Sequence, residues 1–473
     1  MLQPWMKVSI IDAGHFDKDT AYAAINTLRL DDNRPHILRT HDGGRTWTEI
    51  VNGIPGGQTI NVVREDPVRK GLLYAGSERQ VYVSFDDGDH WQSLRANMPA
   101  TSIRDLIIKG DDLAVGTHGR GFWILDNVTP IRQLAAMRDT HLFEPQTAWR
   151  VRFNLNSDTP LPPDEPYQEN PPDGAAIDYY LAGNARNVEL EIRDASGRVV
   201  RTYHNTDKLP EIKDIGNWPA YWLRRPQPLA STAGAHRFFW DMHYQPIPGI
   251  PPSYPIAANY MNTAPEPTSP WAHPGRYKAV LRVDGKEYTQ NLEIRMDPRV
   301  RATDEDLKKQ FDLSLALYEL RMRFEPANAQ INGLMTQLEV ARKTASPAVS
   351  SQIDAFEAKL AQVTGAPGAG RRRGGAAAGQ LSFGINDRIA QVFGTLQEGD
   401  YAPTTVTETA ARDLIKQGNE TLAAWDALLK NDLPQMQNVF KQNNLPELKL
   451  MALQLTHRFP VDKDEDEDTW ARP

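Results

Sequence analysis

One short motif occurs twice near the start of the chain and restricts what this chain can fold into. "THDGGRTW" runs from Thr40 to Trp47, and "SFDDGDHW" runs from Ser84 to Trp91. Both octapeptides place a hydroxyl residue, an Asp, a Gly and a Trp at the same positions, and the second Trp follows the first by 44 residues. This spacing matches the about 40–45 residues of one four-stranded unit in a β-repeat array.

The motif belongs to a wider repeat of short β-strands. Three short apolar segments recur along this part of the chain, at Thr20–Ala24, Gly71–Gly76 and Asp111–Gly116. Each is followed by a second apolar segment bounded by turn residues, which is the pattern of antiparallel strands. The third copy, "AVGTHGRGFWILD", aligns on "YAGSERQVYVSFD" with Asp126 at the place of Asp86, but it lacks the Gly and the Trp of the motif. The sequence therefore predicts two intact repeats and one degenerate repeat.

Each residue type in the motif has a structural explanation. An Asp before a glycine turn accepts hydrogen bonds from the backbone N–H groups of that turn, and Ser or Thr does the same. Gly supplies a positive φ, and Trp carries a large apolar area into the packing between strands. None of these residues is required to break a bond. We therefore expect a structural role for the eight motif residues Thr40, Asp42, Gly44, Trp47, Ser84, Asp86, Gly88 and Trp91.

The pattern Ser/Thr-x-Asp-x-Gly-x-x-Trp resembles the Asp-box, or bacterial neuraminidase repeat (BNR repeat). Asp-boxes occur in the propellers of sialidases, of xyloglucanase-type glycosidases and of sortilin-type receptors. The run "LYAGSERQVYVSFDDGDHWQSL…DLAVGTHGRGFWILD" is similar to the last blades of bacterial sortilin-like proteins, which are often labelled glycosyl hydrolases. The resemblance implies partial β-propeller blades over residues 1–135, boxes at the blade periphery, and a periplasmic or secreted location.

The number of repeats conflicts with a closed propeller. A propeller needs about 4–8 blades to close, and residues 1–135 encode about three. Open blades would expose strand edges and an apolar face. We therefore expect either a fragment that lacks upstream blades or a chain that closes the propeller with another chain. The start "MLQPWMKVSIIDAGHFDKD" has no signal-peptide pattern and resembles a strand entered in mid-fold.

Residues 136–300 keep the period of two without the repeat. Apolar residues alternate through "AAIDYYLAG", "VELEIRDASGRVVRTY" and "RYKAVLRVDGKEYTQNLEIRMD", and Asp284–Gly285 is a two-residue hairpin signal. This pattern favours an immunoglobulin-like β-sandwich, and these segments resemble the accessory domain of the bacterial proteins. Two proline-rich segments, at 161–174 and 245–275, could form stacking surfaces for a sugar or a peptide. We favour long irregular loops.

The period changes to that of helices at Thr303. Thr303 and Asp306 form a capping-box pattern, and apolar residues then follow at helical spacing. We expect a helical bundle over residues 301–460, a Gly/Ala/Arg linker at 365–380 that interrupts it, and an acidic tail at 461–473. The linker arginines Arg371–Arg373 could contact an anionic partner, although solvated charges are the simpler interpretation.

Composition excludes several classes of protein. Lys and Arg total 53 against 61 Asp and Glu, so the net charge of −8 gives no basic surface for nucleic acid. No segment reaches the about 20 apolar residues of a membrane span. Cysteine is absent, so disulfides and thiolate metal sites are excluded.

Candidate active-site residues are few. His118 and Arg120, in "THGRGFW", are candidates for a ligand-facing loop, although a plain hairpin turn is the favoured interpretation. The adjacent acids Asp86–Asp87 and Asp111–Asp112 do not have the separation that glycosidases need, because neighbouring strand residues point apart. His236 and His243 do not have the spacing of a metal site. We expect no catalytic residue, no metal and no cofactor.

The sequence therefore favours a non-catalytic binding or scaffold protein of propeller blades, a β-sandwich and a helical bundle, with a glycan or a peptide as the candidate ligand. The first alternative is the accessory C-terminal half of a sialidase- or xyloglucanase-like glycoside hydrolase whose catalytic acids lie upstream. The second alternative is a component of an assembly whose helices recruit a partner.

Overall fold

The computed structural model is mainly β in its first three hundred residues and helical after them. It describes residues 2–134, 139–152, 171–209, 220–223, 225–248, 250, 252–254, 265–365 and 382–450. The acidic tail, Arg371–Arg373 and most of the segment 161–174 lie outside the described residues, as does almost all of the expected linker. Within the described residues, none of the helices combines the length and the apolarity that a membrane crossing needs.

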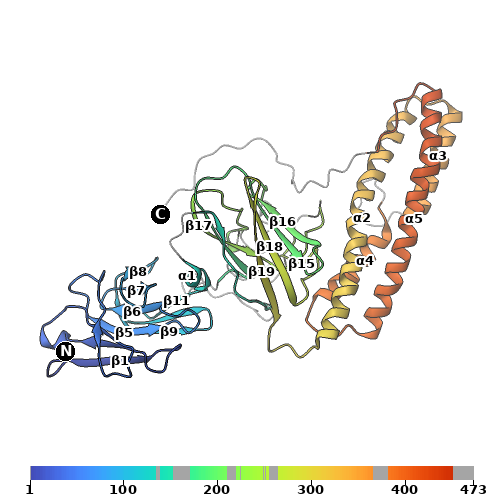
Figure 1. Cartoon of the computed structure of the whole chain (residues 1–473). Coiled ribbons are helices and arrows are strands. Elements are labelled where there is room, and N and C mark those ends of the chain that lie inside the picture. Colours follow the sequence, from blue (N-terminus) through green and yellow to red (C-terminus); the bar gives the residue numbers. More distant parts are fainter. Residues whose placement is uncertain are drawn as a thin grey trace. The chain divides into compact units, whose positions relative to one another are not determined.

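The chain divides into two compact units (Figure 1). The first contains Met1–Gln146 and Asp178–Ala182, and the second contains Thr147–Ile177 and Gly183–Pro473.

The first unit is built from three antiparallel sheets whose strands follow one another in chain order. The first sheet contains β1 (Lys7–Ala13), β2 (Ala21–Asn26), β3 (Ile37–Thr40) and β4 (Thr48–Glu49). The second sheet contains β5 (Ile60–Glu65), β6 (Leu73–Ser77), β7 (Val81–Ser84) and β8 (Gln92–Ser93). The third sheet contains β9 (Ser102–Lys109), β10 (Asp112–His118) and β11 (Phe122–Leu125). The short helices η1 (Leu28–Leu30) and α1 (Thr129–Gln133) and the pair β12 (His141–Leu142) and β14 (Ala175–Leu181) complete the strands and helices that contribute to this unit.

Two apolar cores hold the three sheets together, and β7 contributes to both. Tyr82 lies in the core shared by the first and second sheets. Val81 and Val83 point to the opposite face, into the core shared by the second and third sheets. Because side chains alternate along a strand, the near-continuous apolar run of β7 is explained by burial on both faces.

The strand register corrects the sequence alignment of the third repeat. Gly76 pairs with Val81 in the second sheet, whereas Gly116 pairs with Phe122 in the third. The turn before β11 is therefore one residue longer than the turn before β7. Phe122, and not Gly121, is the counterpart of Val81, and Asp126 does not occupy the place of Asp86.

The second unit contains a five-stranded sheet with the order β13-β19-β18-β15-β16. Its strands are β13 (Ala148–Arg150), β15 (Val188–Asp194), β16 (Val199–His204), β18 (Gly275–Val283) and β19 (Lys286–Met296), and this unit also contains β17 (Gly234–Trp240) and η2 (Ala220–Trp222). The predicted hairpin at Asp284–Gly285 is confirmed, because Val283 pairs with Lys286 and both turn residues have positive φ, 48° and 88°.

Four helices form the rest of the second unit, and α2 and α5 lie side by side (Figure 1). They are α2 (Asp304–Arg342), α3 (Pro347–Thr364), α4 (Gly384–Gln397) and α5 (Thr405–Gln442). The predicted capping box is confirmed, since Thr303 accepts a hydrogen bond from the N–H of Asp306 and the Asp306 side chain accepts one from the N–H of Thr303. A Cβ at Gly418 of α5 would lie 2.8 Å from Leu320 of α2, so this glycine allows the close approach of the two helices.

Two arginines, the buried Arg150 and the partly buried Arg152, join the five-stranded sheet and the segment after it to the loop before α5. Arg150 and Arg152 both form ion pairs with Asp400, whose side chain is 3% exposed. Both guanidinium groups also lie 5.5 Å from the ring of Trp271. Burial raises the pKa of Asp400, but the two guanidinium groups outweigh burial and hold this pKa below its usual value. The carboxylate is therefore the counter-charge of both arginines.

We expect Asp400→Asn to destabilise the second unit by about 3 kcal/mol, because it leaves the guanidinium groups of Arg150 and Arg152 without their counter-charge in a largely buried position. The measurement is chemical denaturation followed by far-UV circular dichroism. The matched control is Asp312→Asn, which removes an exposed pair with Lys308 and should change stability by no more than about 0.5 kcal/mol. Equal effects of the two substitutions would contradict this assignment.

Candidate functional site

The first motif closes a tight turn after β3. Thr40 Oγ1 donates to Asp42 Oδ1 over 2.9 Å and accepts from the N–H of Gly44 over 3.0 Å. The Asp42 carboxylate accepts from both the N–H and the hydroxyl of Thr46, over 2.9 and 2.7 Å. Gly44 has a φ of 85°, which a residue with a Cβ rarely adopts. The hydroxyl of Thr40 and the carboxylate of Asp42 are therefore bonded within their own turn.

The second motif repeats this arrangement after β7. Ser84 Oγ donates to Asp86 over 2.9 Å and accepts from the N–H of Gly88 over 2.9 Å. Asp86 accepts from the N–H of His90 over 2.9 Å, and its other oxygen lies 2.7 Å from His90 Nδ1. Gly88 has a φ of 91°. The imidazole of His90 takes the place of the Thr46 hydroxyl.

Hydrogen bonding shifts the pKa of the motif carboxylates. The N–H and hydroxyl of Thr46 lower the pKa of Asp42 to about 2. Burial raises the pKa of Asp86, but hydrogen bonds from His90 and Ser84 outweigh burial and hold the pKa below its usual value. Both groups are carboxylates at neutral pH, so neither can act as a proton donor in acid catalysis.

The two tryptophans differ in what they contact. Trp91 is 3% exposed, and its indole N–H donates to the carbonyl of Ile50 over 2.9 Å. Its backbone N–H donates to Asn52, so Trp91 is bonded twice to the preceding repeat. Trp47 is only partly buried, and its indole N–H donates to Gly44 in its own turn over 3.1 Å. The second motif therefore connects two repeats, whereas the first motif closes one turn.

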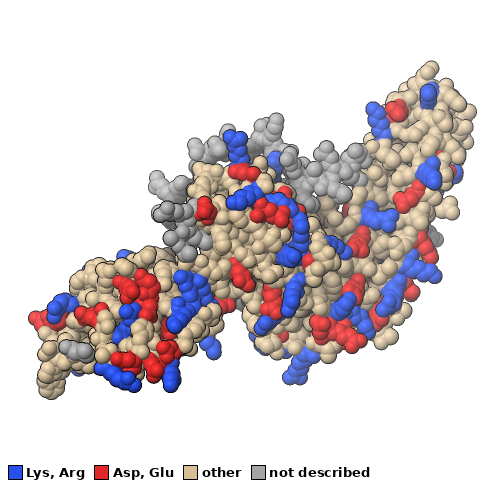
Figure 2. Space-filling model, viewed as in Figure 1, with Lys and Arg blue, Asp and Glu red and all other residues tan. Residues whose placement is uncertain are grey.

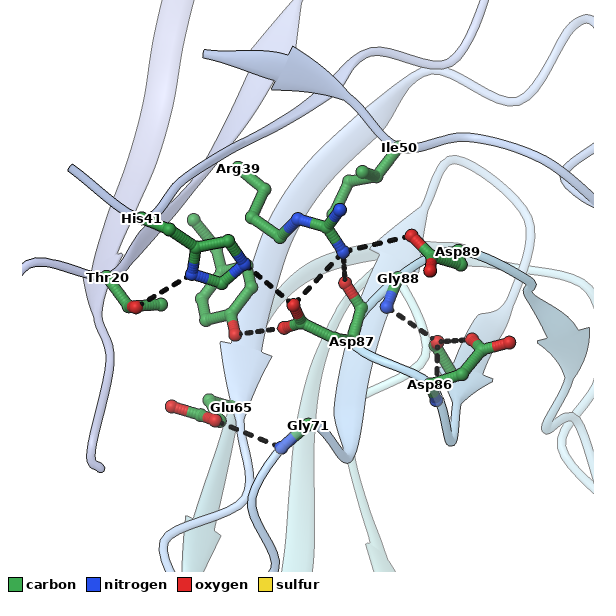
Figure 3. A network of polar contacts seen from close by, with 12 residues as sticks. Thr20, Arg39, His41, Ile50, Glu65, Gly71, Asp86, Asp87, Gly88 and Asp89 are labelled. Carbon is green, nitrogen blue, oxygen red and sulfur yellow. Dashed lines mark hydrogen bonds and ion pairs between the residues drawn. The ribbon is translucent and has the colours of Figure 1, made fainter. Parts of the chain in front are cut away.

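A polar cluster around Asp87 joins the first sheet to the turn after β7 (Figure 3). The hydroxyl of Tyr22 donates to Asp87 Oδ1 over 2.5 Å, and His41 Nε2 lies 2.9 Å from Asp87 Oδ2. Arg39 forms an ion pair with the same carboxylate at 3.1 Å and a second one with Asp89 at 3.0 Å. Burial and the hydrogen bond to Asp87 raise the pKa of Tyr22. Asp87 itself has a φ of 61°, a left-handed conformation that Asp tolerates better than most residues.

The cluster contains a hydroxyl, an imidazole and a carboxylate in hydrogen-bonded order, as in acyl-transfer triads. Thr20 Oγ1 lies 2.9 Å from His41 Nδ1, and His41 Nε2 lies 2.9 Å from Asp87. Thr20 is 8% exposed, however, and the Asp87 carboxylate is also bound by Tyr22 and Arg39. Because the hydroxyl is shielded and the carboxylate already binds two groups of the first sheet, we interpret the cluster as a joint between repeats.

The adjacent acids have separate partners. Asp86 is bonded within its turn, and Asp87 is bonded to the first sheet. Asp111 forms an ion pair with Arg132, whereas Asp112 accepts from the N–H of Asn127 over 2.9 Å. Each of these four carboxylates is thus occupied by a different structural contact.

His118 is the last residue of β10, and Arg120 lies in the turn that follows it; both residues are exposed. The N–H of Arg120 donates to Thr117 over 3.2 Å, and its carbonyl accepts from the indole of Trp123 over 3.0 Å. These backbone contacts close the turn and leave both long side chains at the surface.

The two candidate histidines, His236 and His243, do not form one site. His236 Nε2 lies 2.6 Å from the carbonyl of Thr232. His243 lies with its ring 4.0 Å from that of Trp271, and burial lowers its pKa. Among the residues that the structure describes, no group of three or more His, Cys, Asp or Glu side chains is placed to hold a metal ion.

Acidic and basic side chains are mixed over each unit in the view of Figure 2, and neither sign gathers into a large patch there. A strongly basic surface that would attract nucleic acid is not present on that face.

Sequence analysis missed the cluster around Asp87. Tyr22, Arg39 and Asp87 lie far apart in the sequence, and no spacing connects them. One signal was present: the residue before the motif glycine is Gly43 in the first copy and Asp87 in the second, and Gly43 also has a positive φ of 72°. An Asp at a position that favours Gly suggests a side chain with a specific contact.

The chain matches no protein-family model and no curated protein sequence. Among solved structures, it is similar to YCF48 bound to D1 peptide (13% identity, 43% of this chain and 56% of that chain, TM-score 0.18). It is also similar to an ancestral GH74 enzyme (12% identity, 61% and 35%, TM-score 0.22). A third match is the extracellular domain of BT4673, described as a hybrid two-component system, from B. thetaiotaomicron (10% identity, 59% and 30%, TM-score 0.19).

These matches span between 30% and 56% of the length of the matched chains. No functional conclusion follows from TM-scores this low.

We expect Asp87→Asn to destabilise the first unit by about 1–3 kcal/mol, because it removes the charge that pairs with Arg39 and an acceptor for Tyr22 or His41. Asn tolerates the left-handed conformation, so a change in backbone strain would not explain the loss of stability. The measurement is thermal and chemical unfolding followed by tryptophan fluorescence.

The matched control is Asp89→Asn, because Asp89 has a 58% exposed side chain and contacts the same arginine. Its effect should stay within about 0.5 kcal/mol. If Asp89→Asn costs as much as Asp87→Asn, the cluster does not join the repeats as described.

Proposed function

We propose that this chain is the non-catalytic binding or scaffold part of a sortilin-like Asp-box β-propeller protein. In this proposal the three sheets of the first unit are propeller blades, and the two motifs are Asp-boxes. The five-stranded sheet and its neighbouring strands form an immunoglobulin-like accessory sandwich, and the helices form a bundle.

One observation supports a structural role for the motifs most directly. In both copies, the hydroxyl and the carboxylate are bonded to N–H groups and side chains of their own turn. A carboxylate that attacks or protonates a substrate must be free to face it. The motif that gives such proteins their hydrolase label therefore supplies contacts for the fold.

Contacts between repeats support the proposal that further blades complete the array. The second motif is bonded to the preceding repeat through Trp91, and Trp47 is the equivalent residue of the first motif. At the other end, the third sheet leaves Phe122 and Ile124 exposed, where Val81 and Val83 of the second sheet are buried. Blades from other residues of the protein, or from another chain, would cover both ends.

The ligand and the location remain part of the proposal. A glycan or a peptide is the ligand class, and a periplasmic or secreted location follows from the resemblance to sortilin-like proteins. The exposed turn with His118 and Arg120 is the candidate contact for such a ligand.

Hydrolysis assays test the non-catalytic role. We expect the purified chain to release no product from chromogenic sialosides or β-glucans, because the described acids near the motifs have structural partners. A sialidase and a glucanase in parallel reactions serve as positive controls.

The double substitution Asp42→Asn with Asp86→Asn should lower the melting temperature of the chain. Turnover of either substrate class that a single Asp or Glu substitution abolishes would instead establish a glycoside hydrolase and overturn the proposal.

A further inference from the structure

The third sheet is one strand short of the other two within the described residues. The first and second sheets end on β4 and β8, whereas the third sheet ends on β11. On this edge strand, Phe122 is 89% exposed and Ile124 is 61% exposed. Proteins avoid open edge strands with exposed apolar side chains, because such edges pair with other strands. The edge of β11 is therefore a candidate interaction surface.

The complete sheets define what a fourth strand looks like. β4 and β8 each consist of two exposed polar residues, Thr48–Glu49 and Gln92–Ser93. Each is followed by an aliphatic residue whose N–H donates over 2.9 Å to the carbonyl of the first residue of the third strand: Ile50 to Ile37, and Leu94 to Val81. The fourth strand is thus a polar–polar–aliphatic segment.

The strand register identifies the equivalent position in the third sheet. Phe122 is the counterpart of Val81, as the pairing with Gly116 and Gly76 shows. The carbonyl of Val81 faces β8. Because the backbone groups of successive residues alternate in direction along a strand, those of Val83, two residues later, also face β8. The backbone groups of Phe122 and Ile124 therefore face the outer side of β11, where no further strand is formed by the part of the chain that the structure describes.

The described residues that directly follow β11 do not supply the missing strand. The chain returns toward the turn between β9 and β10, where the N–H of Val128 donates to the carbonyl of Asp111 over 2.7 Å. Arg132 of α1 forms ion pairs with Asp111 and Asp66, so α1 is bonded to this turn.

We propose that the edge of β11 binds an extended peptide segment of a separate polypeptide by β-strand addition. The segment runs antiparallel to β11 and has the pattern polar–polar–aliphatic. The N–H of its aliphatic residue donates to the carbonyl of Phe122, and its aliphatic side chain covers the Phe122 ring, as Leu94 packs beside Val81 in the second core. This inference deepens the binding role proposed above, on which it rests, by naming the ligand class and its place.

The charged residues beside the edge of β11 predict which residue the bound segment should carry at its end. In the second sheet, Tyr82 pairs with Ser93 and Val83 with Gln92, so the fourth strand runs toward the start of the third strand. The end of a bound segment would therefore lie beside the exposed turn that contains His118 and Arg120. An acidic residue after the aliphatic position should strengthen binding at low salt.

The probe is a fluorescein-labelled peptide with the sequence of residues 89–97, DHWQSLRAN, which contains the fourth strand of the second sheet. Fluorescence anisotropy with the full chain should show saturable binding. N-methylation of the peptide at its Leu should weaken binding about tenfold, because it removes the N–H that bonds to Phe122 but keeps the side chain. Glu in place of the Arg of the peptide should bind more tightly.

The chain variant is Ile124→Pro, with Ile124→Val as its control. Proline is tolerated at an edge strand where its N–H faces outward, so the variant should fold and lose peptide binding. The valine variant keeps the N–H and should bind within about twofold of the wild type. Circular dichroism reports folding. If the proline variant does not fold, the N-methyl peptide tests strand addition on the wild-type chain through a neighbouring hydrogen bond of the same edge, the one to the Phe122 carbonyl.

Three results would overturn the proposal: no binding of the probe, binding that is insensitive to both N-methylation and Ile124→Pro, or a dimer of the chain that Ile124→Pro dissociates. The last result would assign the edge to a second copy of this chain. None of these results depends on glycoside hydrolysis, so failure of strand addition and failure of the proposed non-catalytic role are separate outcomes.

Discussion

The hydrogen bond from a turn N–H to the motif carboxylate is the contact on which the first unit depends. It fixes the turn after β3 through Asp42 and the turn after β7 through Asp86. Once the second turn is closed, Trp91 is directed to the carbonyl of Ile50 and Asp87 to Tyr22 and Arg39. A local turn motif thereby determines how one repeat attaches to the one before it. The geometry of the turn thus determines how the two sheets pack.

This dependence also explains why the two copies of one motif differ in burial. Gly88 lies against Ile50, and a Cβ at Gly88 would lie 2.3 Å from the Ile50 side chain, so no larger residue fits between these repeats. At Gly44 the nearest atom to such a Cβ belongs to Trp47 of the same motif, at 3.7 Å. The same residue types therefore perform two tasks. They close a turn in both copies of the motif, and in the second copy they also bind the preceding repeat.

Sequence analysis predicted the elements that depend on local chemistry. The capping box at Thr303 and the hairpin at Asp284–Gly285 follow from neighbouring residues, and both are present in the structure. The sequence did not predict the longer turn before β11, because a sequence alignment alone does not show whether Gly121 or Phe122 pairs with Gly116. It also missed the buried pair of Arg150 and Asp400, since residues so far apart in the chain leave no periodic signal. Long-range polar contacts require the tertiary structure.

Amide hydrogen exchange in the two turns tests the central claim most directly. If the motif carboxylates close the turns, the N–H groups of Thr46 and His90 exchange slowly although both residues are exposed. In the Asp86→Asn variant, protection at His90 and at the N–H of Trp91 should fall, while Thr46 stays protected. Unchanged protection at His90 in this variant would contradict the account, because the carboxylate would then hold no turn.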